Sequence, residues 1–339
     1  MMERIRNLTV RDIPEARELW ASCFDDSSAF MDWFFQCRYR PEFSLALEID
    51  EKIVCIAHGC PMKVRIRQAI LPALMICGVA TRTEFRGHGY MHRIMAALVA
   101  LSRDNDIPVV FHSPAKLNTY FSIGHLPCTD TLRWIAPQDA AVSEPLWSEI
   151  PDLTALVDCY NAATLHYSGS TVRSQYDMQL KLDDYRSDGA HCLTAWQHDR
   201  LDGYLIACPS EQSGAWTAPE VIARNPAVYQ TLLKQLPIGS SAKLPPDLQL
   251  PGIIEPQGVM GVASASALLR AVCGDPALTF AVADPLLSSN NGVFDGCGRP
   301  VSRAAQYSLS AGELLQMLSG YTGSDSHFPK CVCFCVDEY

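Results

Sequence analysis

The sequence has little basic charge. It holds 27 lysines and arginines against 37 aspartates and glutamates, which gives a formal net charge of −10. Nucleic acids and anionic membranes need a cationic surface, so this balance argues against both as partners. A cationic substrate is weakly favoured, although an acidic surface that only keeps the protein in solution is the commoner reason for such a charge.

Long apolar runs are also missing. The longest, residues 69–80, is interrupted by Pro72 and is shorter than the roughly 20 residues that a membrane-spanning helix needs. Residues 1–10 are mixed in polarity and do not resemble a signal peptide, so we expect a cytoplasmic protein. The 14 cysteines are scattered through strand and helix patterns, and we interpret them as reduced thiols of the core.

One stretch, residues 77–93, carries a strong chemical signal in its sequence CGVATRTEFRGHGYMHR. The apolar residues 74–80 predict a buried strand, and the apolar positions of residues 94–99 predict a helix that packs on it. The turn between them holds two glycines. A strand, a glycine turn and a helix in this order leave the first amides of the helix directed at the turn.

Such a turn is suited to phosphate groups. Gly87 and Gly89 lack side chains that would block the backbone, Arg86 adds a cation, and the helix N-terminus adds partial positive charge. The P-loop lysine is absent, and His92 stands where a dinucleotide-binding motif has its last glycine. Coenzyme A is therefore the best candidate ligand.

The same stretch resembles motif A of the GNAT N-acetyltransferases, Arg/Gln-x-x-Gly-x-Gly/Ala, with Arg86 first and Gly89 fourth. Met91 departs from the pattern, which usually has a small residue there. Residues 108–112 predict a second buried strand, and residues 120–125 are similar to the Tyr-x-x-apolar-Gly-aromatic segment of that family. A chance glycine turn would not explain two ordered motifs.

The resemblance implies a binding site for acetyl-CoA as co-substrate. In the GNAT pattern the backbone of a splayed strand, here residues 79–81, hydrogen-bonds the pantetheine and the thioester oxygen, whereas an ordinary buried strand would account only for residues 74–78. The implied cofactor-binding residues are Val79, Ala80, Thr81, Arg86, Gly87, His88, Gly89, Tyr90, Met91, His92 and Asn118.

Tyr120 occupies the position that donates a proton to the leaving thiolate in the resembling families. A phenol with a pKa of about 10 protonates a thiolate with a pKa of about 8.5 only partly, but it hydrogen-bonds the thiolate strongly. The alternative is a buried tyrosine with a purely structural role.

The order of predicted elements favours a GNAT-type mixed α/β (α+β) sheet with flanking helices over residues 1–137. Helices are predicted at residues 12–23 and 28–37, a hairpin at 44–49 and 53–60, and a further strand at 62–70. Residues 138–256 repeat this order as a degenerate GNAT-like unit. No Arg-x-x-Gly-x-Gly follows its strands, so we interpret it as scaffold, and the proline-rich residues 243–256 as a linker.

The pattern over residues 257–339 first predicts a helix at 263–272, a strand at 278–282 and a turn-rich hairpin at 284–298. A capping box at Ser310 then opens a second helix, and a terminal strand is predicted at 330–336. This order resembles the sterol-carrier-like C-terminal domain of the enhanced intracellular survival (Eis) acetyltransferases. Two GNAT-like units followed by such a domain is the layout of that family.

The Eis resemblance also implies residues for the acceptor amine. The general base would be the terminal carboxylate of Tyr339, and Asp26 and Trp33 would contact the substrate. Each has a plainer interpretation. The last residues of a chain are commonly frayed, and the Asp25–Asp26 pair is a normal helix cap.

We therefore expect a GNAT N-acetyltransferase that transfers acetyl directly, in a ternary complex, to a cationic small molecule such as an aminoglycoside or to a lysine side chain. The alternative is a non-catalytic acyl-CoA or lipid-binding module. Cys331, Cys333 and Cys335 would lie about 7 Å apart along a strand, a poor zinc set, so no metal is expected. The resemblance also allows a homo-oligomer.

Overall fold

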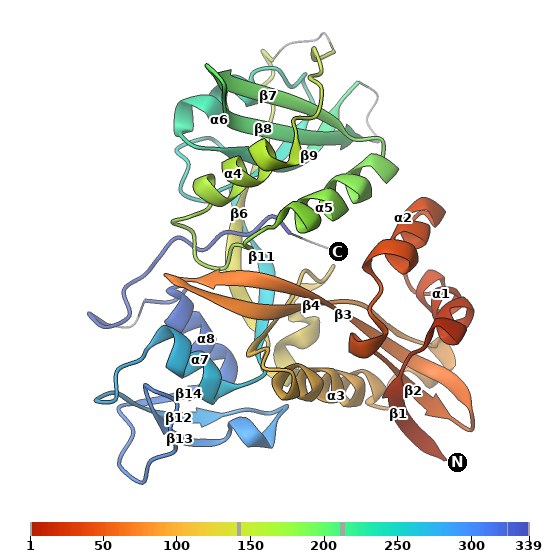
Figure 1. Ribbon diagram of the computed structural model, residues 1–339, viewed down its shortest axis with the longest axis vertical. Coiled ribbons are helices and arrows are strands. Elements are labelled where there is room, and N and C mark those ends of the chain that lie inside the picture. The colour runs from red at the N-terminus through yellow and green to blue at the C-terminus, as the bar shows by residue number, and fades with distance from the viewer. Residues whose placement is uncertain (1, 141–143, 211–213, 324, 338–339) are drawn as a thin grey trace. The chain divides into compact units, whose positions relative to one another are not determined.

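The computed structural model describes residues 2–140, 144–210, 214–323 and 325–337. They divide into two compact units: unit 1 comprises Met1–Cys128, Gly258–Cys331 and Asp337–Tyr339, and unit 2 comprises Thr129–Gln257 and Val332–Val336. Figure 1 shows the elements of both. The division of the sequence into 1–137, 138–256 and 257–339 stays a prediction. Most of the last segment is grouped with unit 1.

Unit 1 is built on a mixed sheet with the strand order β1-β2-β3-β4-β5-β11. Its neighbouring strands are antiparallel except β4 and β5, which are parallel and are connected through helix α3, because two parallel strands cannot be joined by a tight turn. The elements are β1 (Glu3–Asn7), α1 (Ile13–Ala21), α2 (Ser28–Trp33), β2 (Ser44–Ile49), β3 (Lys52–Ile66), β4 (Ala69–Thr81), α3 (Tyr90–Asp104), β5 (Val109–His112) and β11 (Ile253–Val262).

Helix α3 covers one face of this sheet, as its apolar pattern predicts. Ile94, Met95, Leu98 and Val99 are fully buried in one cluster with Ala57 and other strand residues. The next residue along β3, His58, faces the opposite side of the sheet because side chains alternate along a strand, and there it meets Trp20 of α1. The sheet is therefore covered by α3 on one face and by the N-terminal helices on the other.

The further strand predicted at residues 62–70 is wrong. Strand β3 continues without a break to Ile66, and the chain turns at Arg67, whose φ is +53°, before β4 begins at Ala69. Pro61 lies within β3 without interrupting it, because the pairing of β3 with β2 ends at His58, so beyond this point a proline removes no ladder hydrogen bond to β2.

The C-terminal part of unit 1 contains helices α7 (Ala265–Val272) and α8 (Ala311–Ser319) and a small sheet of β12 (Thr279–Ala283), β13 (Gly292–Asp295) and β14 (Tyr307–Ser310). The predicted capping box is confirmed, since Ser310 and Glu313 exchange side-chain and backbone hydrogen bonds. Arg67 donates to the carbonyl of Leu318 at the end of α8 at 2.7 Å, which ties the β3–β4 turn to this part. Its sterol-carrier-like character stays a prediction.

Unit 2 repeats the order of elements of unit 1. Two helices, α4 (Leu153–Ala163) and α5 (Gln175–Ser187), precede the antiparallel strands β7 (His191–Gln197), β8 (Arg200–Pro209) and β9 (Trp216–Ala223), and then come α6 (Pro226–Leu233) and β10 (Ser241–Leu244). β10 is parallel to β9 and antiparallel to β6 (Leu126–Ile135). The second GNAT-like topology is thus present.

Two further predictions are corrected here. The linker at residues 243–256 is shorter than expected, because β10 extends to Leu244 and β11 begins at Ile253. The terminal strand at 330–336 is absent as a regular strand, and only Cys333 makes an isolated bridge, to Ser168. Residues 333–336 are all buried. Within the described residues, no helix has the length and apolar character needed to cross a membrane.

A buried ion pair holds the interior of unit 2. Arg173 donates to both carboxylate oxygens of Glu220 at 2.7 and 2.8 Å, and the two side chains are 3% and 0% exposed. The hydroxyl of Tyr204 donates to the same carboxylate at 2.6 Å. A fully desolvated pair of this kind is costly to break, because the remaining charge has no water to solvate it.

We expect Glu220→Gln to lower the free energy of unfolding by about 3–5 kcal/mol, since it leaves Arg173 buried without its counter-charge. The matched control is Glu255→Gln. Glu255 pairs with Arg133 at 2.9 Å, but both side chains are over 40% exposed, so its loss should cost about 1 kcal/mol or less. Equal losses of the two variants in urea unfolding would contradict the assigned role of the buried pair.

Candidate active site

The site begins with a bulge in strand β4. Along β3, Ile56 pairs with Ala80 and His58 pairs with Cys77, so two steps on β3 span three steps on β4. The extra residue is accommodated at Gly78, whose φ is +55°. A Cβ at this position would lie 2.1 Å from Cζ3 of Trp20, so only glycine fits beneath the indole.

The bulge is followed by a divergence of two strands. The pairing of β4 with β5 ends at Met75, although β4 stays paired with β3 as far as Thr81. Residues 76–81 therefore have a sheet neighbour on one side and no β5 partner on the other. This is the splayed strand expected for Val79, Ala80 and Thr81, and their backbone groups are placed where an extended ligand can pair with them.

The glycine turn lies directly after this strand. Gly87 and Gly89 have φ values of +81° and +77°, and a Cβ built on either would meet nothing within 4 Å. Gly89 is the N-cap residue of the 15-residue helix α3. The turn thus presents bare backbone and the positive end of a long helix to open space, an arrangement that favours phosphate oxygens.

The predicted cofactor residues around the turn have distinct surroundings. Arg86 is exposed and donates from Nε to the carbonyl of Thr81 at 3.1 Å, while His88 stacks on Tyr90 with ring centroids 5.8 Å apart. The Tyr90 hydroxyl donates to Glu3 of β1 at 3.2 Å. Met91 is half-buried, whereas His92 and Asn118 are exposed.

Tyr120 lies on a 3-10 turn, Leu117–Ile123, and its side chain is buried. Its ring meets the ring of His112 edge to face, with centroids 4.1 Å apart. Burial raises the pKa of Tyr120 to about 12, so the phenol stays protonated at neutral pH. It is a hydrogen-bond donor held in a largely desolvated position at the end of β5.

His112 is linked in turn to His125. Nε2 of His112 and Nδ1 of His125 are 2.9 Å apart, and both rings are buried. Burial lowers the pKa of His125 to about 3 and that of His112 well below its usual value, so both are neutral near pH 7. Sequence reasoning missed His112, and the only available signal was its position at the end of the second strand.

The predicted substrate residues lie beside an aromatic cluster on the face of the sheet opposite α3. Asp26 accepts a 2.6 Å hydrogen bond from Nε1 of Trp20, and Trp33 is buried and packs against Phe30 at a centroid distance of 5.6 Å. Because Trp20 also covers Gly78, Asp26 is connected through one side chain to the β4 bulge.

His58 lies at the centre of this aromatic cluster, defined here as Trp20, Phe34, Phe35, Tyr39 and His58. The Ser44 hydroxyl donates to the carbonyl of Arg40 at 2.8 Å, so it can only accept from Nδ1–H of His58 at 3.0 Å. Among the described residues, Nε2 of His58 has no hydrogen-bond partner. Burial lowers the pKa of His58 to about 3, so the imidazole is neutral near pH 7 and its Nε2 is an acceptor.

Tyr339 lies outside the described residues. Among the residues that are described, no group of three or more His, Cys, Asp or Glu side chains is placed to hold a metal ion. Tyr120 and the cofactor residues belong to unit 1, as do Asp26 and Trp33.

Comparison with known proteins agrees with this geometry. Residues 4–127 match the Acetyltransferase (GNAT) domain family. Residues 4–127 form a GNAT acetyltransferase domain. The chain is thus an acetyltransferase, and acyl transfer is its chemistry. No curated protein has a sequence that matches the chain.

Solved structures extend the likeness in fold to the whole chain. A probable N-acyltransferase from Enterococcus faecalis has a TM-score of 0.81 at 15% identity, and Eis1 from Mycobacterium abscessus has 0.75 at 15%, each with 100% of both chains covered. A GCN5-related N-acetyltransferase from Anabaena variabilis has 0.77 at 15%, again over 100% of both chains. The resemblance to Eis-type GNAT proteins is confirmed at the level of fold.

We expect Gly89→Val to weaken acetyl-CoA binding by at least about tenfold, because its side chain would occupy the open space at the turn. The matched control is Gly214→Val in unit 2, where φ is +79° and a Cβ also meets nothing within 4 Å. The backbone strain is then similar, and only the first variant should lose affinity in calorimetry. Equal affinities of the two variants would remove the glycine turn from the site.

The buried histidines predict a pH dependence of stability. The pKa of His58 is about 3 in the folded state against about 6.5 in the unfolded chain. Between these two pH values the imidazole is protonated in the unfolded state but not in the folded state, so protonation favours unfolding. Stability should fall as pH decreases from about 6.5 toward 3. His58→Phe should reduce that slope by about 1.4 kcal/mol per pH unit, measured by urea unfolding between pH 7 and 5.

Phe34→Leu is the control for this measurement, because Phe34 packs against His58 but carries no proton. It should lower stability by a similar amount at every pH. A slope that is the same in the His58→Phe variant and the native chain would show that His58 is accessible to protons in the folded state.

Proposed function

We propose that unit 1 binds acetyl-CoA and transfers its acetyl group directly, in a ternary complex, to the amine of a cationic small molecule such as an aminoglycoside or to a lysine side chain. The observation that supports this most strongly is the β4 bulge followed by strand divergence and an open glycine turn. Coenzyme A has the matching parts, a pantetheine that can pair with a strand edge and a pyrophosphate that suits a helix N-terminus.

Each part of the chain has a role in this proposal. The turn at Arg86–Gly89 and the first amides of α3 hold the phosphates, and the backbone of Val79, Ala80 and Thr81 pairs with the pantetheine and polarises the thioester carbonyl. Asn118 lies on the same turn as Tyr120 and contacts the pantetheine from the β5 side. Binding in one fixed geometry supplies most of the rate enhancement, because the two reactants no longer have to meet in solution.

Tyr120 stabilises the leaving sulfur. With a pKa of about 12 it holds its proton more tightly than a thiol with a pKa of about 8.5, so it donates a hydrogen bond to the developing thiolate rather than losing its proton outright. The low-polarity surroundings that raise the pKa also strengthen this hydrogen bond. The base that the resemblance assigns to Tyr339 stays a prediction.

The acceptor side is the aromatic cluster with Asp26 and Trp33. A protonated amine is attracted to the Asp26 carboxylate and to aromatic faces, and the net charge of −10 favours cations in general. Nε2 of His58 is one further acceptor in the cluster. It cannot repel a cation, because it stays neutral at any pH near 7.

The test is Tyr120→Phe in an assay of thiol release from acetyl-CoA with a panel of aminoglycosides, polyamines and lysine peptides. We expect turnover to fall by about 100-fold or more while the Kd for acetyl-CoA changes less than about twofold, since the hydroxyl acts only on the developing thiolate. Tyr307→Phe, which removes a hydroxyl from the small sheet, is the control and should leave both unchanged.

Equal losses of turnover and binding in Tyr120→Phe would make Tyr120 structural. Tight binding of acetyl-CoA without thiol release for any amine would instead favour the alternative function, an acyl-CoA or lipid-binding module.

A further inference from the structure

The guanidinium group of Arg86 is held by two other residues of unit 1. Its Nε donates to the carbonyl of Thr81 at 3.1 Å, and its Nη2 donates to Sγ of Cys23 at 3.3 Å. The thiol of Cys23 in turn donates to the same carbonyl of Thr81, with a longer distance of 3.7 Å. The three groups therefore form a closed triangle of hydrogen bonds beside the glycine turn.

Cys23 is itself fixed by the end of a helix. It follows α1 and is half-buried, and its backbone amide donates to the carbonyl of Trp20 at 2.8 Å. The last turn of α1 thus determines where the thiol lies. Trp20 is also the side chain that covers Gly78, so the end of α1 supports both the β4 bulge and, through Cys23, the cation of the glycine turn.

The rest of the guanidinium group is available to a ligand. Arg86 is exposed, and among the described residues its Nη1 has no hydrogen-bond partner and its charge has no carboxylate partner. An exposed arginine side chain normally samples many rotamers, and a ligand that binds it must restrict them. Two contacts that restrict the side chain beforehand remove part of this entropic cost, so an anion at the turn binds more tightly.

We propose that Cys23 is a positioning residue for acetyl-CoA: it holds Arg86 at the glycine turn, where the guanidinium group pairs with the pyrophosphate. This inference rests on the proposed function, because it takes the turn at residues 86–89 as the phosphate site. Cys23 acts through Arg86 and has no contact with the phosphates. A serine at position 23 would keep both hydrogen bonds, since a hydroxyl donates and accepts, whereas an alanine would keep neither.

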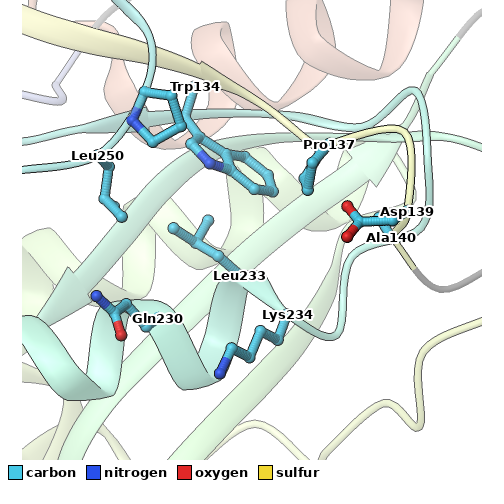
Figure 2. Close-up of a pocket in the computed structure, with 9 residues that line it drawn as sticks. Trp134, Pro137, Asp139, Ala140, Gln230, Leu233, Lys234 and Leu250 are labelled. Carbon is cyan, nitrogen blue, oxygen red and sulfur yellow. The ribbon is translucent and has the colours of Figure 1, made fainter.

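A cation of unit 2 lacks this arrangement. Unit 2 contains a cavity of about 550 Å³, and Figure 2 shows Lys234 lining it together with Trp134 and Leu233. Lys234 is the C-cap residue of α6, where the helix dipole is negative, whereas Arg86 precedes the N-terminus of α3, where the dipole is positive. This end of α6 does not favour phosphates, and Lys234 is therefore a control for the removal of one positive charge.

The test is a double-mutant cycle, measured by calorimetry with acetyl-CoA on the full chain. Cys23→Ala should weaken binding by about threefold and Arg86→Ala by about tenfold, as expected for partly exposed contacts of a charged group. The double variant should also lose about tenfold, because Cys23 then has no guanidinium group to position. A loss of about 30-fold in the double variant would show two independent effects and overturn the proposal.

A second ligand separates positioning from a general effect on the fold. S-Acetylpantetheine has the thioester arm of acetyl-CoA but no phosphate, so its affinity, measured in competition with acetyl-CoA, should be the same in Cys23→Ala and in the native chain. Equal losses for the two ligands would assign the effect to the strand edge instead of Arg86 and would contradict the proposal. Cys23→Ser should retain most of the affinity for acetyl-CoA, and a loss as large as that of Cys23→Ala would contradict it as well.

Two controls complete the experiment. Cys37→Ala, which removes another half-buried thiol of unit 1, and Lys234→Ala should leave the affinity for acetyl-CoA unchanged. The outcome also separates this inference from the proposed function. A native chain that does not bind acetyl-CoA would defeat both, whereas a native chain that binds it, with independent effects of Cys23 and Arg86, would defeat only the role of Cys23.

Discussion

The candidate active site depends on one constraint: strand β4 must stay paired with β3 on one side while it separates from β5 on the other. It stays paired with β3 as far as Thr81, yet it leaves β5 after Met75. The extra residue at Gly78 makes this possible, because a left-handed residue turns the strand without breaking its pairing to β3. Trp20 packs on the bare backbone of Gly78 and prevents the bulge from relaxing. The geometry of the candidate site thus depends on a glycine that is not itself one of the predicted site residues.

Unit 2 shows that the topology alone does not create such a site. Its β9 and β10 also pair over only two positions, at Thr217 and Ala218, so a divergence exists there as well. No glycine turn follows β9, where the chain continues through Asn225 directly into α6. Tyr229 of this helix is almost fully buried in one core cluster with Ala223 at the end of β9, so protein occupies the region beside that strand. The two copies therefore differ in the sequence of this turn, which is the feature on which the proposed binding of coenzyme A rests.

The sequence predicted the parts of the structure that depend on local pattern. The strand, glycine turn and helix of residues 74–99 and the capping box at Ser310 follow from spacing alone, and the structure has them. The failures share a cause. Whether β3 continues past Pro61 depends on where the neighbouring strand β2 ends. Whether residues 330–336 form a strand depends on a neighbour to pair with, and among the described residues only Cys333 has one, in its bridge to Ser168. The bulge at Gly78 likewise depends on the register between β3 and β4, which cannot be predicted from the sequence of β4 alone.

The contacts of Asp26 also depend on a neighbouring element that its own sequence does not show. From the sequence, Asp26 was either a helix cap or a substrate contact. In the structure its carboxylate accepts a hydrogen bond from the indole of Trp20. An amine that pairs with Asp26 must share this carboxylate with Trp20 or displace the indole, and Trp20 is the side chain that holds the β4 bulge. Under the proposed function, recognition of the acceptor would therefore be coupled to the shape of β4 through two contacts, from Asp26 to Trp20 and from Trp20 to Gly78. His58 packs against Trp20 in the same cluster and is neutral near pH 7, so it adds no charge change beside the indole there.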